Sequence, residues 1–143
     1  MADETVTRAQ GVGIPGVRDA VSVRMPAASA YLSVLRTATA GLAARLDFTI
    51  DQIEDLRIAV DEACAMLLRQ AVPGTDLITE FVLDGHEMIV RVEVSTVGTA
   101  EPRRDDFAWM VLTALADDVD AVTDSPDRMA IVLRKRRDAA GPV

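Results

Sequence analysis

The chain contains little cysteine, few basic residues and no long apolar run, and each shortage excludes a class of protein. Cys64 is the only cysteine in 143 residues, so no disulfide can form within the chain. Lys and Arg number 15 against 23 Asp and Glu, for a formal net charge of −8. This balance argues against direct nucleic-acid binding, which needs a basic surface. Because no apolar run approaches the length of about 20 residues that spans a membrane, and the first residues resemble no export signal, we expect a cytoplasmic protein without a membrane partner.

Length and composition indicate one globular domain. The chain is 50% hydrophobic and 27% charged, which is typical of a domain with a single buried core. Residues 1–17 are expected to form a flexible arm, followed by the domain at 18–137 and a flexible tail at 138–143. Within the arm, residues 11–16 spell G-x-G-x-x-G. A dinucleotide-binding loop follows a strand and opens a helix, so we predict no phosphate loop here.

The clearest element is a helix at 49–72. Thr49 and Gln52 form the pattern of a capping box, and Pro73-Gly74 are expected to end the helix. Apolar residues recur between these limits at helical spacing and predict one buried stripe: Ile53, Leu56, Val60, Ala63, Cys64, Leu67 and Ala71. Because Cys64 lies on this stripe, we expect a buried thiol.

The remaining patterns predict two more helices and five strands. The strands are expected at 20–25, 77–83, 88–94, 120–124 and 129–134, and the helices at 27–46, opened by Pro26, and at 107–119, with Phe107, Val111, Ala114 and Leu115 facing inward. His86, the only histidine, lies in the hairpin turn at 84–87 and is interpreted as a turn residue rather than a metal ligand. The basic run at 134–137 is interpreted as a solvated end of the last strand. Periodicity alone therefore indicates a two-layer α+β domain.

Two segments resemble a known family. LRIAVDEACAMLL at 56–68 resembles the segment l-x-x-a-V-S-E-A-v-x-N-A of the GHKL ATPase superfamily, in particular the serine-kinase anti-sigma factors of the RsbW and SpoIIAB type. FAWMVLTALADDVD at 107–120 resembles the corresponding helix of the actinobacterial, mycobacterial-type anti-sigma-F branch. The resemblance covers about 18–137. It implies a Bergerat-type sandwich, with a mixed, mostly antiparallel sheet and three helices on one face.

The resemblance places the family's catalytic carboxylate at Glu62. In the family this group polarises the attacking hydroxyl, and an Asn one helical turn later gives an amide oxygen to Mg²⁺. Met66 stands at the Asn position in this chain. A thioether is a soft, weak acceptor and cannot replace an oxygen ligand of a hard cation. Without the resemblance, Glu62 is interpreted as a solvated helix carboxylate.

The other nucleotide motifs implied by the resemblance are also altered. The family has Asp-x-Gly-x-Gly at the end of the strand at 88–94, where the Asp receives the adenine amino group and the glycines let the backbone close on the nucleotide. Here Glu93 or Ser95 would have to replace the Asp, and Gly98 is the only glycine, displaced from its expected place. Glu62, Met66, Ser95 and Gly98 are therefore predicted to form a degenerate nucleotide pocket. ATP and Mg²⁺ are the cofactors that the family implies, and we predict no metal ligand set.

Two aspartates precede the helix at 107–119. In the family this place carries G-x-G-L, which brings helix-terminal amides to the phosphates. Asp105 and Asp106 would instead repel an anion, and their structural interpretation is an N-cap.

Three function classes follow. The first is an anti-sigma factor that sequesters an alternative sigma factor of the sigma-F or sigma-B kind and releases it to a STAS-type anti-anti-sigma antagonist. The second is an active ATP-dependent serine/threonine kinase that phosphorylates this antagonist, and the third is an unrelated structural module. The lost Mg²⁺ ligand favours the first. The resemblance also implies a homodimer that pairs through the strand at 20–25.

Two residues are predicted to bind the partner. Arg36 matches the arginine that faces the partner in this family, and arginine pairs well with carboxylates at interfaces. Trp109 lies off the stripe predicted for its helix, and exposed aromatics are enriched in interface hot spots. The alternatives remain open: Arg36 is a solvated helix arginine, or the helix of Trp109 is covered on both sides within the fold.

Overall fold

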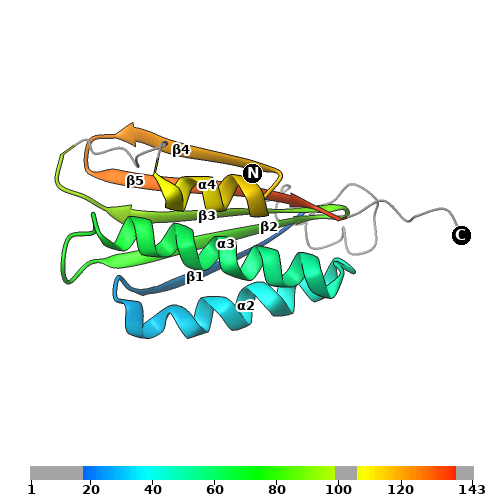
Figure 1. Cartoon of the computed structure of the whole chain (residues 1–143). Helices are drawn as coiled ribbons and strands as arrows, with labels where there is room; N and C mark the ends of the chain where they lie inside the picture. Colours follow the sequence, from blue (N-terminus) through cyan, green and yellow to red (C-terminus); the bar gives the residue numbers. More distant parts are fainter. Residues whose placement is uncertain (1–17, 99–105, 138–143) are drawn as a thin grey trace, which may run out of the picture.

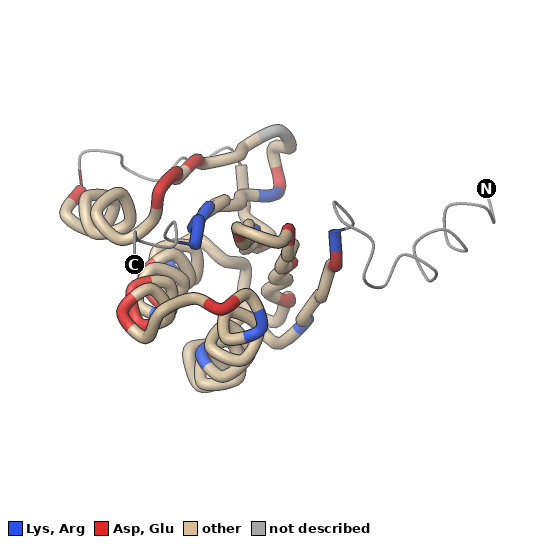
Figure 2. The backbone as a smooth tube through the Cα atoms, turned by 90° about the vertical axis from the view of Figure 1, so that its right-hand side faces the viewer, with Lys and Arg blue, Asp and Glu red and all other residues tan. Residues whose placement is uncertain are grey.

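Three helices cover one face of a five-stranded sheet (Figure 1). The structure is a computed structural model that describes residues 18–98 and 106–137. The elements in chain order are β1 (Asp19–Pro26), the 3-10 helix η1 (Ser29–Tyr31), α2 (Leu32–Arg45), α3 (Ile50–Leu68), β2 (Asp76–Asp84), β3 (Glu87–Ser95), α4 (Phe107–Leu115), β4 (Asp118–Ser125) and β5 (Arg128–Arg136). Figure 2, viewed along the strands, shows the helices as one layer and the sheet as the other. The predicted two-layer α+β domain is confirmed.

The strand order is β1-β2-β3-β5-β4, and neighbouring strands are antiparallel throughout. The expectation of a mixed sheet is therefore wrong for the described strands. The reason lies in the connections. Two antiparallel helices, α2 and α3, return the chain to the end where β1 finished, so β2 must run opposite to β1. The single helix α4 makes β4 parallel to β3, but β5 lies between them and is antiparallel to both.

Buried and more exposed side chains alternate along the strands, so one face of the sheet forms part of the core. In β2 and β3 every second side chain is buried against the helices, and the others face the opposite surface of the sheet. The largest fully buried side chains come from both layers: Phe81, Leu35, Leu56, Leu67, Leu77, Met88, Leu112, Met129, Ile131, Leu133, Val60 and Val90. None of the described helices is long and apolar enough to cross a membrane.

The predicted capping box starts α3. The Thr49 hydroxyl accepts from the backbone N–H of Gln52 at 3.1 Å, and the Gln52 side chain accepts from the backbone N–H of Thr49 at 3.2 Å. The helix ends at Leu68, earlier than the predicted end at 72. Beyond it, the backbone N–H of Val72 donates to the carbonyl of Ser95, which ties this segment to the end of β3.

Helix α2 begins later than predicted. Pro26 ends strand β1 opposite Asp76 and does not open a helix, because Ala28 is extended with φ −145° and ψ 139°. A 3-10 turn, η1, then leads into α2 at Leu32.

Helix α4 is shorter than predicted and presents a different face. It ends at Leu115, because Asp118 and the residues after it pair with β5 as strand β4. Its buried residues are Ala108, Trp109 and Leu112, whereas Phe107 is 76% exposed. The predicted inward stripe through Phe107 is therefore wrong.

The basic run at 134–137 is only partly a solvated strand end. Strand β5 continues to Arg136, and its alternation turns Lys135 toward the helices. The Lys135 side chain is 12% exposed, its Nζ donates to the Leu115 carbonyl at 2.8 Å, and it lies 3.6 Å from Oδ2 of Asp55. Lys135 thus joins β5 to both α3 and the end of α4. The predicted N-terminal arm with its glycine pattern, Asp105 and the predicted tail lie outside the described residues.

Candidate functional site

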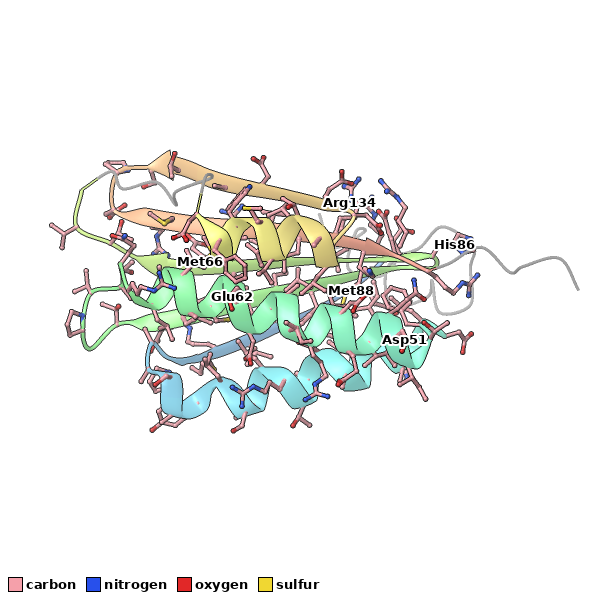
Figure 3. All side chains as sticks on the ribbon, viewed as in Figure 1. Asp51, Glu62, Met66, His86, Met88 and Arg134 are labelled. Atoms are coloured by element: carbon pink, nitrogen blue, oxygen red, sulfur yellow. The ribbon has the colours of Figure 1, made fainter. Side chains whose placement is uncertain are left out.

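Glu62 and Met66 lie one turn apart on α3, in the part of the helix near α4 (Figure 3). The Glu62 side chain is partly buried, and its carboxylate has no hydrogen bond or ion pair with any residue in 18–98 or 106–137. Met66 is 7% exposed and belongs to the hydrophobic core. The two predicted neighbours are therefore brought together, with a carboxylate on one side and a core thioether on the other.

This pair does not fit a Mg²⁺ site. A thioether packed in the core offers no hard oxygen donor, and Mg²⁺ demands several of them in near-octahedral geometry. Over the described ranges, no group of three or more His, Cys, Asp or Glu side chains could hold a metal ion. Glu62 therefore provides a half-buried carboxylate, but Met66 beside it would not hold the Mg²⁺ that phosphoryl transfer uses.

Glu93 and Ser95 face away from the predicted pocket. Val92 and Val94 are buried against the helices, so the residues beside them in β3 point to the opposite face of the sheet. Glu93 there forms an ion pair with Arg128 at 3.3 Å. The prediction that Glu93 or Ser95 replaces the adenine-binding Asp is therefore not supported by the direction of either side chain.

Thr96 is the residue that the sequence reasoning missed. It is 5% exposed, its backbone N–H donates to the Asp127 carbonyl at 2.8 Å, and its hydroxyl donates to the Gly98 carbonyl at 3.2 Å. Gly98 has φ +75°, a conformation that favours glycine. Placing Thr96 in the Asp position would put Gly98 on the first glycine of Asp-x-Gly-x-Gly. Continuing the alternation of β3 by two residues past Val94 predicts that Thr96 faces inward.

Asp106 caps α4, as predicted. Its Oδ1 accepts from the backbone N–H of Ala108 at 3.4 Å, so a carboxylate lies at the helix start where the family's phosphates dock. A triphosphate at this position would meet a negative charge.

Arg36 lies on the exposed side of α2 and reaches α3. Its Nε donates to both carboxylate oxygens of Asp61, at 2.9 and 2.8 Å. The two side chains are 45% and 35% exposed, so the pair lies at the surface. Arg36 therefore lies off the buried face of α2, and its role in partner binding stays a prediction.

Trp109 is not on an outer face. It is 7% exposed and packs in the core, so the geometric basis for its predicted partner contact is wrong. The alternative of a helix covered on both sides is wrong as well, because Phe107 and Met110 are 76% and 60% exposed. These two side chains, rather than Trp109, form the apolar surface of α4.

His86 lies at the tip of the β2–β3 hairpin, at the end of the molecule where α3 begins (Figure 3). Its Nδ1 is 3.0 Å from Nη2 of Arg137, and the ring is exposed. Its interpretation as a turn residue agrees with this position, which is remote from Glu62.

The pKa of the Cys64 thiol is raised to about 12, mainly by burial and also by the nearby charge of Asp61, against a smaller opposing effect of Arg36. The side chain is fully buried, as predicted. Because the unfolded thiol titrates near 9.0, this group's contribution to stability is complete below that pH and is lost as the pH rises toward 12.

Alkylation of Cys64 by iodoacetamide at pH 8 is expected to be at least about 100-fold slower in the folded protein than in urea, because the thiolate is the nucleophile. Mass spectrometry of timed samples measures the rate, with Cys64→Ser as the unlabelled control. Equal rates in both states would show that the thiol is accessible.

No protein-family model matches the chain. The chain is 40% identical over 113 residues to the anti-sigma-F factor RsbW of Mycobacterium tuberculosis, an alignment that covers 76% of this chain and 64% of that protein. It is also 40% identical over 53 residues to the serine-protein kinase RsbW of Bacillus subtilis, covering 37% of this chain and 33% of that one. The chain thus spans less than two thirds of the length of these curated relatives.

A solved structure is similar in fold. The crystal structure of the RsbU and RsbW domains of a Mycobacterium tuberculosis protein superposes with a TM-score of 0.66 at 12% identity, over 83% of this chain and 32% of that chain. At this identity the likeness supports the fold and carries nothing about activity.

Proposed function

We propose that the chain belongs with the RsbW proteins and is an anti-sigma factor, which sequesters an alternative sigma factor and releases it to a STAS-type antagonist. The observation that carries the proposal is the 40% identity over 113 residues to an anti-sigma-F factor. A cytoplasmic location belongs to the same proposal, because sigma factors act on RNA polymerase in that compartment.

We further propose that the fold is a GHKL-type sandwich and that the protein forms a homodimer through β1. The element order and the superposition on a structure that contains an RsbW domain support the first. The homodimer is supported by the position of β1, which is an edge strand with mostly exposed residues. An edge strand of this length is expected to pair with, or be covered by, another segment.

Binding rather than catalysis is the favoured activity. Met66 replaces an oxygen ligand with a buried thioether, and Asp106 occupies the helix start that an anion would need. The alternative is an active serine/threonine kinase acting on the antagonist. Its support is Glu62, which stays half-buried at the family's catalytic position, together with the similarity to a serine-protein kinase of Bacillus subtilis.

Direct binding tests the proposal. The purified chain is titrated calorimetrically with each alternative sigma factor and each STAS-type protein encoded by the same genome. The proposal expects saturable binding to at least one sigma factor, displaced by one STAS-type protein. If every sigma factor fails to bind at micromolar concentration, the proposal is wrong.

Phosphotransfer from ATP to the antagonist is expected to be undetectable, and Met66→Asn alone is expected to recover little of it. Groups that act as a unit do not contribute additively, so one repaired ligand leaves the other defects in place. The assay follows labelled phosphate on the antagonist for the native chain, the single variant and a variant that adds Thr96→Asp, Ala100→Gly and Asp106→Gly. Robust turnover by the native chain or by the single variant would mean that the pocket uses other residues.

A further inference from the structure

The exposed side of α4 carries an apolar stripe. Phe107, Met110 and Ala114 are all exposed and follow one another at intervals of three and four residues, so they lie side by side on the helix surface. None of the nine residues of α4 is charged, whereas the solvent side of a surface helix is ordinarily polar. A contiguous apolar stripe on the surface is typical of an interaction site.

Helix α3 packs beside α4 and runs in the opposite direction (Figure 1). Lys135 marks how the two helices are aligned, because its amine contacts both Asp55 of α3 and the Leu115 carbonyl of α4. Glu62 lies about 10 Å beyond Asp55 along α3. The same distance back from Leu115 reaches the first turn of α4. Glu62 is therefore level with the start of the apolar stripe.

The start of the stripe has a negative border. Within the part of the chain that the structure describes, the Glu62 carboxylate has no hydrogen bond or ion pair. Asp106 caps α4 through Oδ1, and its carboxylate has no described cation partner. The next cation along the chain after Glu62 is Arg69, about another 10 Å further on. Two carboxylates are thus left without a counter-charge beside an apolar surface.

We propose that the α4 stripe receives a basic amphipathic helix of the sigma factor, with Phe107 and Met110 against its apolar side and Glu62 and Asp106 against its lysines or arginines. The negative border and the net charge of −8 disfavour an acidic segment. A sigma factor has basic helices to offer, because it binds DNA and a DNA-binding surface is basic. The identity of the partner rests on the proposed function, whereas the chemistry of the occupant rests on the surface itself.

Two substitutions test the apolar contact without touching the core. Phe107→Ala removes the ring, and Met110→Lys places a cation opposite a basic helix. Each is expected to weaken sigma-factor binding by about tenfold or more while the melting temperature is kept, because both side chains are exposed. The matched control is Ile50→Lys, which makes an apolar-to-lysine change at an exposed residue about 18 Å from Glu62 along α3. This control is expected to bind as the native chain does.

Glu62→Gln tests the negative border. The loss of this charge is expected to weaken binding by about threefold or more at low salt, and the difference from the native chain is expected to shrink as salt is added. The titrations contain no nucleotide, so the loss cannot arise from a nucleotide site. The control Glu80→Gln removes an exposed carboxylate on the opposite face of the sheet and is expected to leave binding unchanged. If Glu62→Gln binds as the native chain does at every salt concentration, the occupant is not basic and the proposal is overturned.

The remaining outcomes separate this inference from the proposed function. If the native chain binds the sigma factor and both stripe variants bind it equally well, the stripe proposal is overturned and the anti-sigma function stands. The same holds if the stripe variants lose only the antagonist, or only a dimer in sedimentation velocity, because the stripe then has another occupant.

If no sigma factor binds the native chain, the proposed function fails and a helical peptide of leucine and lysine tests the surface alone. Shifts of the Phe107 and Met110 amide resonances with this peptide, and not with its leucine and glutamate counterpart, support a site for a basic amphipathic helix. The absence of these shifts overturns it.

Discussion

Replacing Trp109 by alanine is expected to lower the free energy of unfolding by about 3–5 kcal/mol, as for other large aromatic side chains removed from a core. Trp109 is 7% exposed and lies in the core with Ala108 and Leu112 of the same short helix. Domains of this size are stable by about 5–15 kcal/mol, so the variant is expected to lose a large part of its stability. Urea denaturation followed by circular dichroism measures the change.

The matched control is Phe107→Ala, two residues away on the same helix. Phe107 is 76% exposed, and surface substitutions of this kind change stability by about 0.5 kcal/mol or less. If Phe107→Ala were the more destabilising of the two, α4 would have to be rotated so that the stripe predicted from the sequence faces the core.

Replacing Arg36 by alanine is expected to weaken binding to the sigma factor by about 30-fold or more, because central arginines that bind carboxylates often act as hot spots worth at least about 2 kcal/mol. Stability is expected to change little. The Arg36–Asp61 pair is 45% and 35% exposed, and surface ion pairs contribute about 0–1 kcal/mol. Calorimetric titration and thermal unfolding of the same preparation measure the two quantities.

Asp61→Asn separates positioning from direct contact. It removes the charge that holds Nε of Arg36 and leaves the guanidinium itself in place. We expect a smaller loss of affinity than for Arg36→Ala, and no further loss when both substitutions are combined. If Arg36→Ala binds as tightly as the native chain, Arg36 is a solvated helix arginine that takes no part in partner binding.

The elements that the sequence predicts correctly are those with strong local signals. The start of α3 depends on a reciprocal capping box, and the β2–β3 hairpin depends on alternation around Gly85, whose φ is +52°. Both signals come from neighbouring residues and require no knowledge of distant contacts. The burial of Cys64 is also predicted correctly, because the apolar stripe of α3 includes it.

The errors arise where tertiary contacts decide. Helix α4 reads FAWMVLTAL and is apolar at nearly every position, so periodicity cannot distinguish its two faces, and the fold buries Trp109 rather than Phe107. The helix ends earlier than the sequence predicts, because pairing of Asp118 with Arg134 on β5 overrides the local helical tendency. The candidate site shows the same division: Glu62 and Met66 share a turn of one helix and could be paired from spacing, whereas the inward position of Thr96 depends on the strand's alternation.

The measurement that tests the account most directly is a titration of the purified chain with the proposed sigma-factor partner, once without nucleotide and once with Mg·ATP. A pocket with Met66 at the metal position and Asp106 at the phosphate position is expected to leave the two affinities equal within about twofold, because a nucleotide that does not bind cannot be coupled to the partner. Sigma binding that requires Mg·ATP, and that is lost in Glu62→Ala, would contradict the account and identify a working nucleotide site.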